Sequence, residues 1–276
     1  MRIAVIVERD DHAMLVEYAA LMRARGHEVA WQHPGARRPD LSADLYLLKS
    51  RTPRALRLGR RAEALGAAVC NTVAATEACV DRAAMAAQAR AAGLPFPVTH
   101  VYPRGAAVSA PGRLIMKSRY CRHDEPLPVV GEAADLRAAG WRDEPVIAQE
   151  FAEGDGWDHK FWVIGDRVFA GLRRPPLDGA AGDPKHTVPV PNVPSDRLDL
   201  ARAVGGAFGL RVYGVDIIAS DAGPVVVDVN AFPGFSGLPG AAEALADLTP
   251  RVLDGDGAEG PEVVGQFRDV PERVRA

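Results

Sequence analysis

Strand-like and helix-like patterns of hydrophobic residues alternate along the first part of the chain. Residues 2–7 and 45–48 are short apolar runs of the kind that form buried strands, and residues 27–31 form a third. Residues 13–25 and 55–65 instead repeat their apolar positions at helical spacing. Because strands alternate with helices, the pattern predicts a small parallel α/β layer.

The remainder of the chain reads mainly as strands. An alanine-rich helix is predicted over residues 76–92 and another helix over 199–208. The Gly165-Asp166 dipeptide favours a hairpin turn. The proline-rich segment 175–194 is too broken for a core element and too long for a simple turn, so we expect a functional loop. The predicted strands span residues 69–71, 113–117, 145–151, 160–164, 167–172, 213–219 and 224–229.

Composition narrows the classes of function. The 276 residues are 47% hydrophobic and carry a net charge of only −3, which argues against a general nucleic-acid coat and a polybasic membrane surface. No apolar run approaches the roughly 20 residues that span a bilayer, and acidic residues from Glu8 onward argue against a signal peptide. Cys70, Cys79 and Cys121 form no C-x-x-C pair, so we expect reduced thiols and a cytoplasmic protein.

Three oxygen-bearing side chains follow one another on the last predicted strands. Asp216 lies in YGVDIIA, and Asp228 and Asn230 lie in VVVDVNAFPG. Residues two apart on a strand share a face, and a hairpin through residues 220–223 can lay Asp216 beside them. Two carboxylates and an amide oxygen are ligands that suit Mg²⁺. The alternative is that both aspartates are ordinary carboxylates near a turn.

Two lysines could meet these carboxylates across a cleft. Lys117 ends one predicted strand and Lys160 begins another, and ammonium groups are good partners for phosphates. Taken singly, each lysine is more typical of a solvated surface residue. Trp157 and Trp162 alternate out of phase with the charged residues, which favours a packing role.

The order of these segments resembles the ATP-grasp superfamily. LIMKS, VIAQEFAEG, DHKFWVIGDRVFAGLRR and YGVDIIASDAGPVVVDVNAFPGFSG follow one another within about residues 70–240. The resemblance implies a mixed α/β, ATP-grasp fold with an N-terminal α/β pre-grasp domain (1–75), a central subdomain (76–148) and a C-terminal subdomain with the metal site (149–276). The nearest branches are the glutamate ligases that modify ribosomal proteins and the inositol polyphosphate kinases, whose R-P-x-L segment is matched by residues 174–177.

The resemblance also implies roles for individual residues. Lys117 would contact the nucleotide phosphates, and Asp158 the ribose. Lys160 and Arg173 would face the transferred phosphate or the acceptor, where charge develops during transfer. The adenine hinge would comprise Gln149, Glu150, Phe151 and Ala152, and the Mg²⁺ ligands would be Asp216, Asp228 and Asn230.

Three positions depart from the family pattern. Most members carry an Asp-Lys pair where this chain has Asp81-Arg82, so Arg82 is expected to hold a phosphate with forked geometry. Asp228 replaces the glutamate usual in the ligase branch, which favours the kinase branch. The loop 118–128 lacks phosphate-wrapping glycines and instead carries Arg119, Arg122 and His123, which form either an anion-binding lid or a solvated loop.

The predicted function is an ATP- and Mg²⁺-dependent, ADP-forming enzyme. We expect a carboxylate–amine ligase that works through an acyl phosphate on a small-molecule or peptide acceptor. The alternative is a small-molecule kinase, and a third hypothesis is a nucleotide-binding protein without turnover. Many members pair through the first domain, so a homodimer stays open. A phosphate-rich acceptor would call for Arg119, Arg122, Lys160, Arg173 and Lys185 together.

Overall fold

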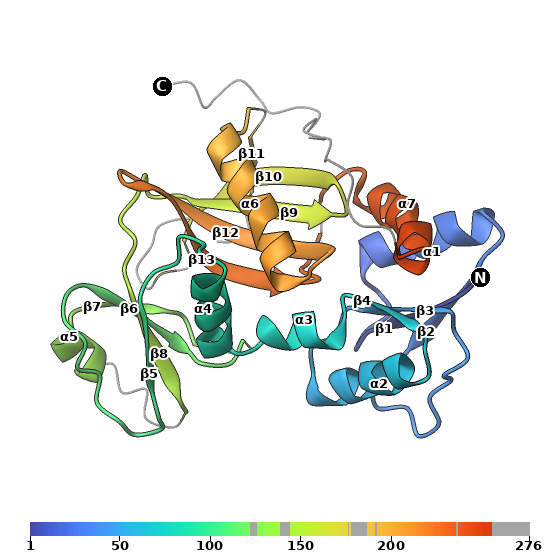
Figure 1. The fold of residues 1–276 in the computed structure, drawn as a ribbon, viewed down its shortest axis with the longest axis horizontal. Helices are drawn as coiled ribbons and strands as arrows, with labels where there is room; N and C mark the ends of the chain where they lie inside the picture. Colours follow the sequence, from blue (N-terminus) through green and yellow to red (C-terminus); the bar gives the residue numbers. More distant parts are fainter. Residues whose placement is uncertain are drawn as a thin grey trace.

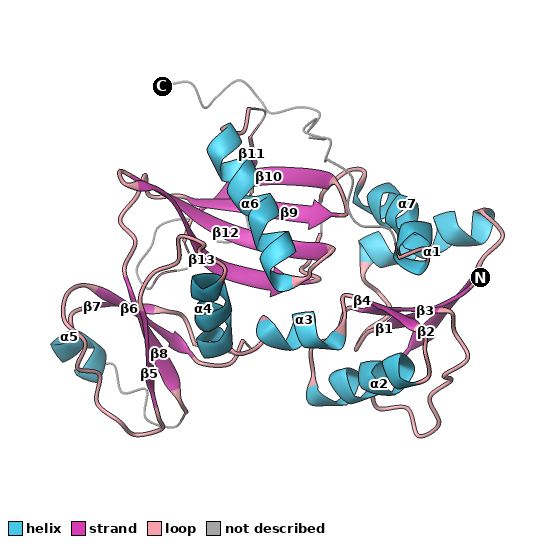
Figure 2. Ribbon diagram, in the orientation of Figure 1, coloured by secondary structure: helices cyan, strands magenta, loops and turns pink. Residues whose placement is uncertain are grey.

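The computed structural model describes residues 1–121, 126–138, 144–175, 177, 187–190, 192–235 and 237–255. Its helices and strands form the mixed α/β architecture that the sequence predicts. In Figure 1 a first sheet lies on the right, a central sheet on the lower left, and a third sheet above and between them. Figure 2 separates the helices from the strands in the same view.

The first sheet is entirely parallel, in the order β2-β1-β3-β4. Side chains on the two faces of this sheet pack into two separate hydrophobic cores. Ile3 and Val5 pack with the first helix on one face, and Ile6 and Leu48 pack with the second helix on the other. The predicted parallel α/β layer is therefore confirmed. Its elements are β1 (Arg2–Ile6), α1 (Ala13–Ala24), β2 (Glu28–Gln32), β3 (Leu45–Leu48), α2 (Pro53–Ala64) and β4 (Ala68–Cys70).

The single helix predicted over residues 76–92 is wrong. The chain instead forms two helices, α3 (Val73–Ala78) and α4 (Arg82–Ala91). Asp81 interrupts the alanine-rich run because its carboxylate accepts the amide of Ala83 at 2.9 Å and so begins a new helix. The Arg82 amide also donates to the Arg119 carbonyl at 2.9 Å, which fixes the break against the chain that leaves the central sheet.

The central sheet is antiparallel, in the order β5-β8-β6-β7. Its predicted strands are confirmed with shifts of about one residue, whereas its two short outer strands and its helix were not predicted. The sheet has a small core of its own, which includes Leu114, Leu136 and Val146. Its elements are β5 (Thr99–Tyr102), β6 (Leu114–Ser118), β7 (Val129–Gly131), α5 (Ala133–Ala138) and β8 (Val146–Glu150).

The third sheet has five strands, in the order β11-β10-β9-β12-β13. The predicted hairpin at Gly165-Asp166 joins β9 to β10, and Gly165 has the positive φ of 61° that such a turn requires. Most of the predicted loop 175–194 lies outside the described residues. The elements are β9 (Asp158–Ile164), β10 (Arg167–Arg173), β11 (Val188–Pro189), α6 (Ser195–Phe208), β12 (Val212–Ser220), β13 (Gly223–Ala231) and α7 (Ala241–Leu253).

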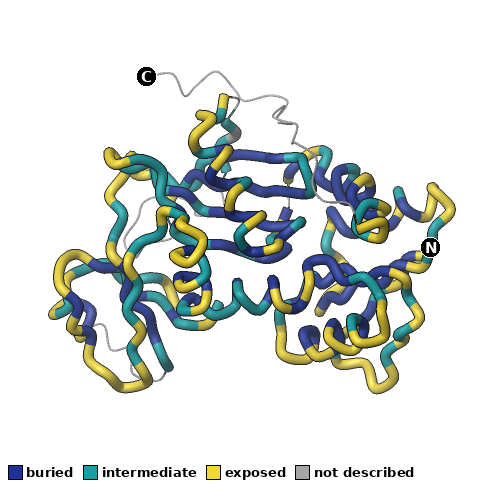
Figure 3. The backbone as a smooth tube through the Cα atoms, viewed as in Figure 1, coloured by how far each residue is buried: buried dark blue, intermediate teal, exposed yellow. Residues whose placement is uncertain are grey.

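Helix α7, which was not predicted, brings together segments that are far apart in the sequence. It packs against α1, and the Tyr18 and Thr249 hydroxyls lie 2.9 Å apart in the buried interface. Leu245 of α7 belongs to the same hydrophobic cluster as Ile3 of the first sheet and Trp162 of the third. The dark blue segments in Figure 3 show how the buried backbone runs through the strands.

The three-part division into residues 1–75, 76–148 and 149–276 stays a prediction. The first boundary falls within α3 and the second within β8, whose residues all belong to the central sheet. Among the described residues, none of the helices has the length and apolar character needed to cross a bilayer.

Candidate functional site

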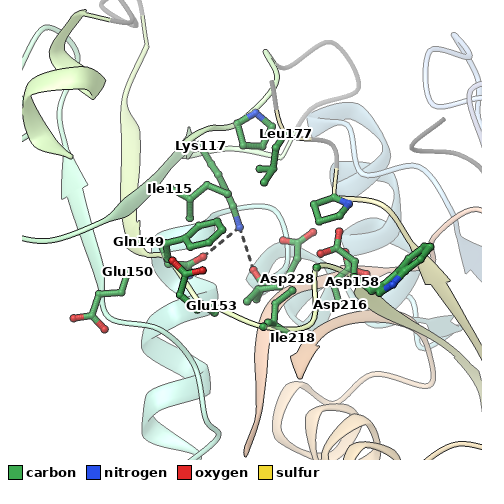
Figure 4. Close-up of a pocket in the computed structure, with 18 of the residues that line it drawn as sticks. Ile115, Lys117, Gln149, Glu150, Glu153, Asp158, Leu177, Asp216, Ile218 and Asp228 are labelled. Atoms are coloured by element: carbon green, nitrogen blue, oxygen red, sulfur yellow. Dashed lines mark hydrogen bonds between the residues drawn. The ribbon is translucent and has the colours of Figure 1, made fainter. Parts of the chain in front are cut away.

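A cavity of about 740 Å³ lies between the central sheet and the third sheet. That volume falls within the range of small-molecule and cofactor pockets. Figure 4 shows its interior. Lys160, Arg173 and Asn230 are not among the lining residues. The other nine predicted site residues line it: Arg82, Lys117, Gln149, Glu150, Phe151, Ala152, Asp158, Asp216 and Asp228.

Lys117 extends from β6 toward the third sheet. Its Nζ donates to Gln149 Oε1 at 3.2 Å and to the Val227 carbonyl at 3.3 Å (Figure 4). Burial lowers the pKa of this ammonium below its usual value, although the charge of Asp228 opposes the shift. An ammonium held by two neutral oxygens is well placed to receive an anionic group such as a phosphate.

Residues 149–152 leave the central sheet along the cavity wall. Gln149 is only 2% exposed, and its Nε2 donates to Thr99 Oγ1 at 3.1 Å. The Glu150 amide is already bonded to the Val98 carbonyl at 2.9 Å. Its side chain is exposed and points away from the carboxylates of the third sheet in Figure 4. The Glu150 carboxylate therefore stands at the rim of the cavity rather than in its charged interior.

Asp216 of β12 and Asp228 of β13 face each other directly across the hairpin, as predicted. The register shifts immediately after this pair, because Ile217 faces Val226 and Val227 is left over as a bulge. The bulge changes the alternation of side chains. As a result Val226 is fully buried in the core while Asp228 lines the cavity. We call Asp216 and Asp228 the carboxylate pair.

Cations surround the carboxylate pair. Lys160 of β9 forms an ion pair with Asp216, and Arg82 Nε lies 3.8 Å from Asp228 Oδ1. Arg82 is 8% exposed, and its Nη1 donates to the Ser118 carbonyl at 2.9 Å. Burial alone would raise the pKa of Asp228, but the nearby cations together lower it. Burial raises the pKa of Asp216 in spite of Lys160.

Asp158, the first residue of β9, brings a third carboxylate to the cavity. Its side chain lies with the carboxylate pair in Figure 4. Burial and the charge of Asp216 raise the pKa of Asp158 to about 7, although Lys160 and Lys117 act in the opposite direction. Three half-buried carboxylates close together are costly without additional positive charge.

Asn230 and Arg173 make contacts outside the cavity lining. Asn230 Nδ2 donates to Asp228 Oδ2 at 2.8 Å, and its Oδ1 accepts from Arg51 Nη1 at 3.2 Å. Arg173 Nε donates to Thr187 Oγ1 at 2.8 Å, and its guanidinium lies 4.9 Å from the centroid of the Trp162 ring. Asn230 is thus joined to the carboxylate pair, whereas Arg173 is directed toward β11 and Trp162.

The carboxylate pair fits a divalent cation. Asp228 Oδ1 is buried without a hydrogen-bond partner in the described part of the chain, so one oxygen is left for another ligand. No group of three or more His, Cys, Asp or Glu side chains able to hold a metal occurs among the described residues. Mg²⁺ needs only one or two protein carboxylates when water and phosphate oxygens complete its shell. Asp216 and Asp228, with the Asn230 amide, match that requirement.

Trp157 and Arg174 also line the cavity, where the Trp157 ring packs against Arg174. The Arg174 guanidinium lies 3.8 Å from the centroid of the Trp157 ring and donates to the Gly156 carbonyl at 3.3 Å. The R-P-x-L segment was the signal that could have identified Arg174. Ile115 and Ile218 form an apolar part of the cavity wall, and no sequence motif pointed to them.

The loop after β6 is anchored at its first residues. Arg119 Nη2 donates to Asp81 Oδ2 at 2.7 Å and its Nε to Asp81 Oδ1 at 3.0 Å. Arg119 therefore stabilises the start of α4 through Asp81, which argues against the anion-binding lid that was one of the two alternatives for this loop. Arg122, His123 and Lys185 lie outside the described residues.

Residues 130–244 match the family described as the RimK-like ATP-grasp domain. Proteins named probable alpha-L-glutamate ligase are similar over part of the chain. The one from Xanthomonas campestris pv. campestris is 40% identical over 98 residues, which cover 34% of each protein. The one from Trichodesmium erythraeum is 37% identical over 113 residues, 39% of this chain and 37% of that protein. The match thus spans about a third of the length of these relatives.

Solved structures share the fold over almost the whole chain. A RimK domain ATP-grasp protein from Sphaerobacter thermophilus superposes with a TM-score of 0.74 at 21% identity, over 90% of this chain and 98% of that one. D-alanine–D-alanine ligase from Bacillus anthracis gives 0.68 at 16% identity, over 92% and 96%. The ATP-grasp ligase PsnB, complexed with a minimal precursor, Mg and ADP, gives 0.65 at 21%, over 91% and 97%.

Proposed function

Because the chain contains a RimK-like ATP-grasp domain within an ATP-grasp fold, we propose that it is an ADP-forming carboxylate–amine ligase. The observation that carries the proposal is the charge arrangement of the cavity. Asp216 and Asp228 face each other on the third sheet, and Lys117 reaches toward them from the central sheet with Arg82 beside them. A magnesium nucleotide needs carboxylates that bind the metal and cations that bind the phosphates, and this cavity has two of each on opposite walls.

The proposed reaction has two steps. A carboxylate oxygen of the acceptor attacks the γ-phosphorus of ATP, and the bond to the bridging oxygen breaks to release ADP. An amine then attacks the acyl carbon of the resulting acyl phosphate, inorganic phosphate leaves, and the amine nitrogen loses a proton. The product is an amide, and water must be excluded between the steps because it would hydrolyse the acyl phosphate.

Each wall of the cavity has a distinct part in this proposal. Lys117 and Arg82 would hold the nucleotide phosphates, and residues 149–152 would flank the adenine, with Asp158 at the ribose. Mg²⁺, when bound by Asp216, Asp228 and Asn230, would offset the negative charge of the phosphates. Lys160 lies against Asp216 and would stabilise charge on the transferred group, while Arg173 would need to exchange its bond to Thr187 to do so.

Two of the cations that a kinase would use for a phosphate-rich acceptor are already in ion pairs, which argues against the kinase hypothesis. A phosphate-rich acceptor would need several cations not already paired with acids. Arg119 is paired with Asp81, and Lys160 with Asp216. The similar proteins described above are ligases. We therefore propose an acid with an unphosphorylated carboxylate as the acceptor, either a small molecule or a peptide, and an α-amino acid as the amine.

We also propose that the reaction takes place in the cytoplasm, where ATP and Mg²⁺ are abundant. Cys70 and Cys79 are free thiols buried in the fold, which suits a reducing compartment.

Asp228→Asn tests the proposed metal site. Purified protein is supplied with Mg·ATP, a panel of carboxylic acids and a panel of amino acids, and ADP, inorganic phosphate and amide are measured. We expect ADP release that depends on the acceptor, with about a hundredfold loss of kcat in Asp228→Asn, because the variant loses a charged metal ligand. Asp221→Asn, at the exposed tip of the same hairpin, is the matched control and should keep wild-type activity.

Equal activity of Asp228→Asn and Asp221→Asn would mean that the carboxylate pair does not hold the metal. A phosphorylated acceptor without amide would establish the kinase alternative, and nucleotide binding without ADP release from any acceptor would favour the hypothesis of binding without turnover.

A further inference from the structure

Two cationic side chains at the edge of the first sheet contact the C-terminal end of β13. Lys49 and Arg51 follow β3 at the carboxyl edge of the parallel sheet. Lys49 Nζ donates to the Phe232 carbonyl at 3.0 Å, and Arg51 Nη1 donates to Asn230 Oδ1 at 3.2 Å. Asn230 is bonded to Asp228, which lines the cavity. These two cations therefore stand beside the carboxylate pair, on the side of the first sheet.

Neither cation is matched by an acid. Among the described residues, the hydrogen-bond partners of Lys49 and Arg51 are neutral oxygens, a peptide carbonyl and an amide, and no carboxylate lies within ion-pair distance of either. Both side chains belong to residues that are half-buried. Partly desolvated cations without a counter-ion are unfavourable, and an anionic ligand would relieve that cost.

Glu8 is an acid at the same edge of the sheet, and it is already engaged. Ser50 Oγ and Thr52 Oγ1 each donate to Glu8 Oε1 at 2.8 Å, and Glu8 Oε2 lies 3.6 Å from His33 Nε2. Ser50 lies between Lys49 and Arg51, and successive side chains of an extended segment point to opposite sides. Glu8 therefore serves the side of the segment opposite the two cations.

His12 adds a third polar group on the side of Lys49. It precedes α1 and lies close enough to Lys49 to interact electrostatically with its ammonium. Its Nδ1 is buried and makes no hydrogen bond in the described part of the chain. An unpartnered ring nitrogen beside an ammonium without a counter-ion is a second sign, independent of Arg51, that a ligand belongs here.

We propose that Lys49, Arg51 and His12 form the binding site for the carboxylate group of the acceptor. The inference deepens the proposed function and rests on it. In open parallel α/β sheets, ligands bind outside the carboxyl ends of the strands, which is where these residues lie. A carboxylate would give Arg51 a charge-assisted bond in place of its bond to an amide, and would leave Asn230 Oδ1 to a cation. Acceptor and Mg²⁺ would then favour each other's binding.

Glutarate is a suitable probe because it carries carboxylates, and with Mg·ADP in place of ATP it cannot be phosphorylated. Its dissociation constant is measured by calorimetry with protein saturated with Mg·ADP. We expect Arg51→Met and Lys49→Met to weaken glutarate binding about tenfold or more, and Arg51→Lys to retain part of it, because each Met variant loses a charge-assisted bond. Arg54→Met, which removes an exposed arginine from the same segment, is the matched control and should bind glutarate as the wild type does.

Three outcomes would overturn the proposal: no glutarate binding by the wild type, unchanged binding in Arg51→Met, or equal loss in Arg54→Met. If inorganic phosphate binds more tightly than glutarate, and Arg51→Met loses that phosphate binding, the ligand of this site is a phosphate ester and not a carboxylate. Lys49→Met also removes a bond to Phe232, so its melting temperature is measured first, and Arg51→Met decides the question if Lys49→Met does not fold.

The binding site and the proposed reaction fail in different ways. If the ligase proposal is wrong, no amide forms although glutarate binding still depends on Arg51. If the binding site is wrong, amide forms and the KM for the acid is the same in Arg51→Met as in the wild type.

Discussion

The environment of the Asp158 carboxyl disfavours its charged form. It is half-buried beside Asp216, and its pKa is raised from 3.8 to about 7. The unfolded chain releases this proton near pH 4, whereas the folded protein retains it until about pH 7, so the folded state binds more protons between these values. The free energy of unfolding contributed by Asp158 therefore falls as pH rises through this window and is constant above it.

The variant Asp158→Asn removes that dependence. We expect its melting temperature to increase relative to the wild type between pH 4 and pH 7, and the difference to level off above pH 7. Thermal unfolding at several pH values measures it, with the exposed Asp221→Asn as the reference. A difference that is independent of pH would show that the carboxyl of Asp158 is not forced to stay protonated.

The carboxylate pair could be predicted because its two residues lie close together in the sequence. Asp216 and Asp228 could be paired because a hairpin and strand alternation suffice to place them. Arg51 could not be found in this way, because its bond to Asn230 joins residues 179 positions apart. The roles of the twelve predicted residues remain predictions, although nine of them line one cavity.

At the scale of single elements, two adjacent glycines of α6 have opposite environments. A methyl group on Gly205 would lie 2.3 Å from the hydroxyl of Tyr213, which is buried and donates to the Ala201 carbonyl at 3.1 Å. A methyl group on Gly206 would meet nothing within 4 Å. The helix therefore requires glycine at the first position for close packing on β12 and not at the second.

Alanine at the two positions should change stability in opposite directions. We expect Gly205→Ala to lower the free energy of unfolding by about 1–3 kcal/mol through overpacking. Gly206→Ala should raise it by about 0.5–1 kcal/mol because alanine restricts the unfolded chain and favours the helix. Urea unfolding of both variants provides the measurement, and destabilisation of similar size in both would contradict the packing of α6 on Tyr213.

The elements that escaped prediction share a physical cause. Local periodicity identified the strands of the first sheet and all of the third sheet except β11, which lies in the segment predicted as a loop. It also ran through Asp81, where a side chain begins a new helix. The short strands β5 and β7 are held by pairing with distant partners, which the local sequence does not reveal. Helix α7 contains Pro250 in its last turn, and its burial depends on contact with α1.

On the scale of the whole molecule, α7 packs against both the first sheet and the third. Leu245 is 1% exposed in a cluster that joins the first sheet to the third. The central sheet has a separate small core and connects to the third sheet across the cavity through Lys117. We therefore expect the first and third sheets to unfold together.

Leu245→Ala tests this cooperativity. The variant should lower the free energy of unfolding by about 2–5 kcal/mol through the cavity that it leaves. Leu65→Ala, at a leucine that is 67% exposed, should stay within about 0.5 kcal/mol of the wild type. Hydrogen exchange reads out the effect along the chain. Loss of protection in α7 alone, with β1 and β9 unchanged, would show that the two sheets unfold independently.

The bulge at Val227 has a consequence for how this segment tolerates changes in length. It lets Val226 and Val229 both enter the core, although their odd separation would place them on opposite faces of a regular strand. Deletion of Val227 would restore regular alternation with Val226 and Val229 still on the core face and Asp228 with Asn230 still on the other, because the bulge adds one residue to β13. The extra residue therefore matters to the cavity rather than to the core: its carbonyl accepts from the Lys117 ammonium at 3.3 Å, so the deletion should leave the fold intact and remove that contact.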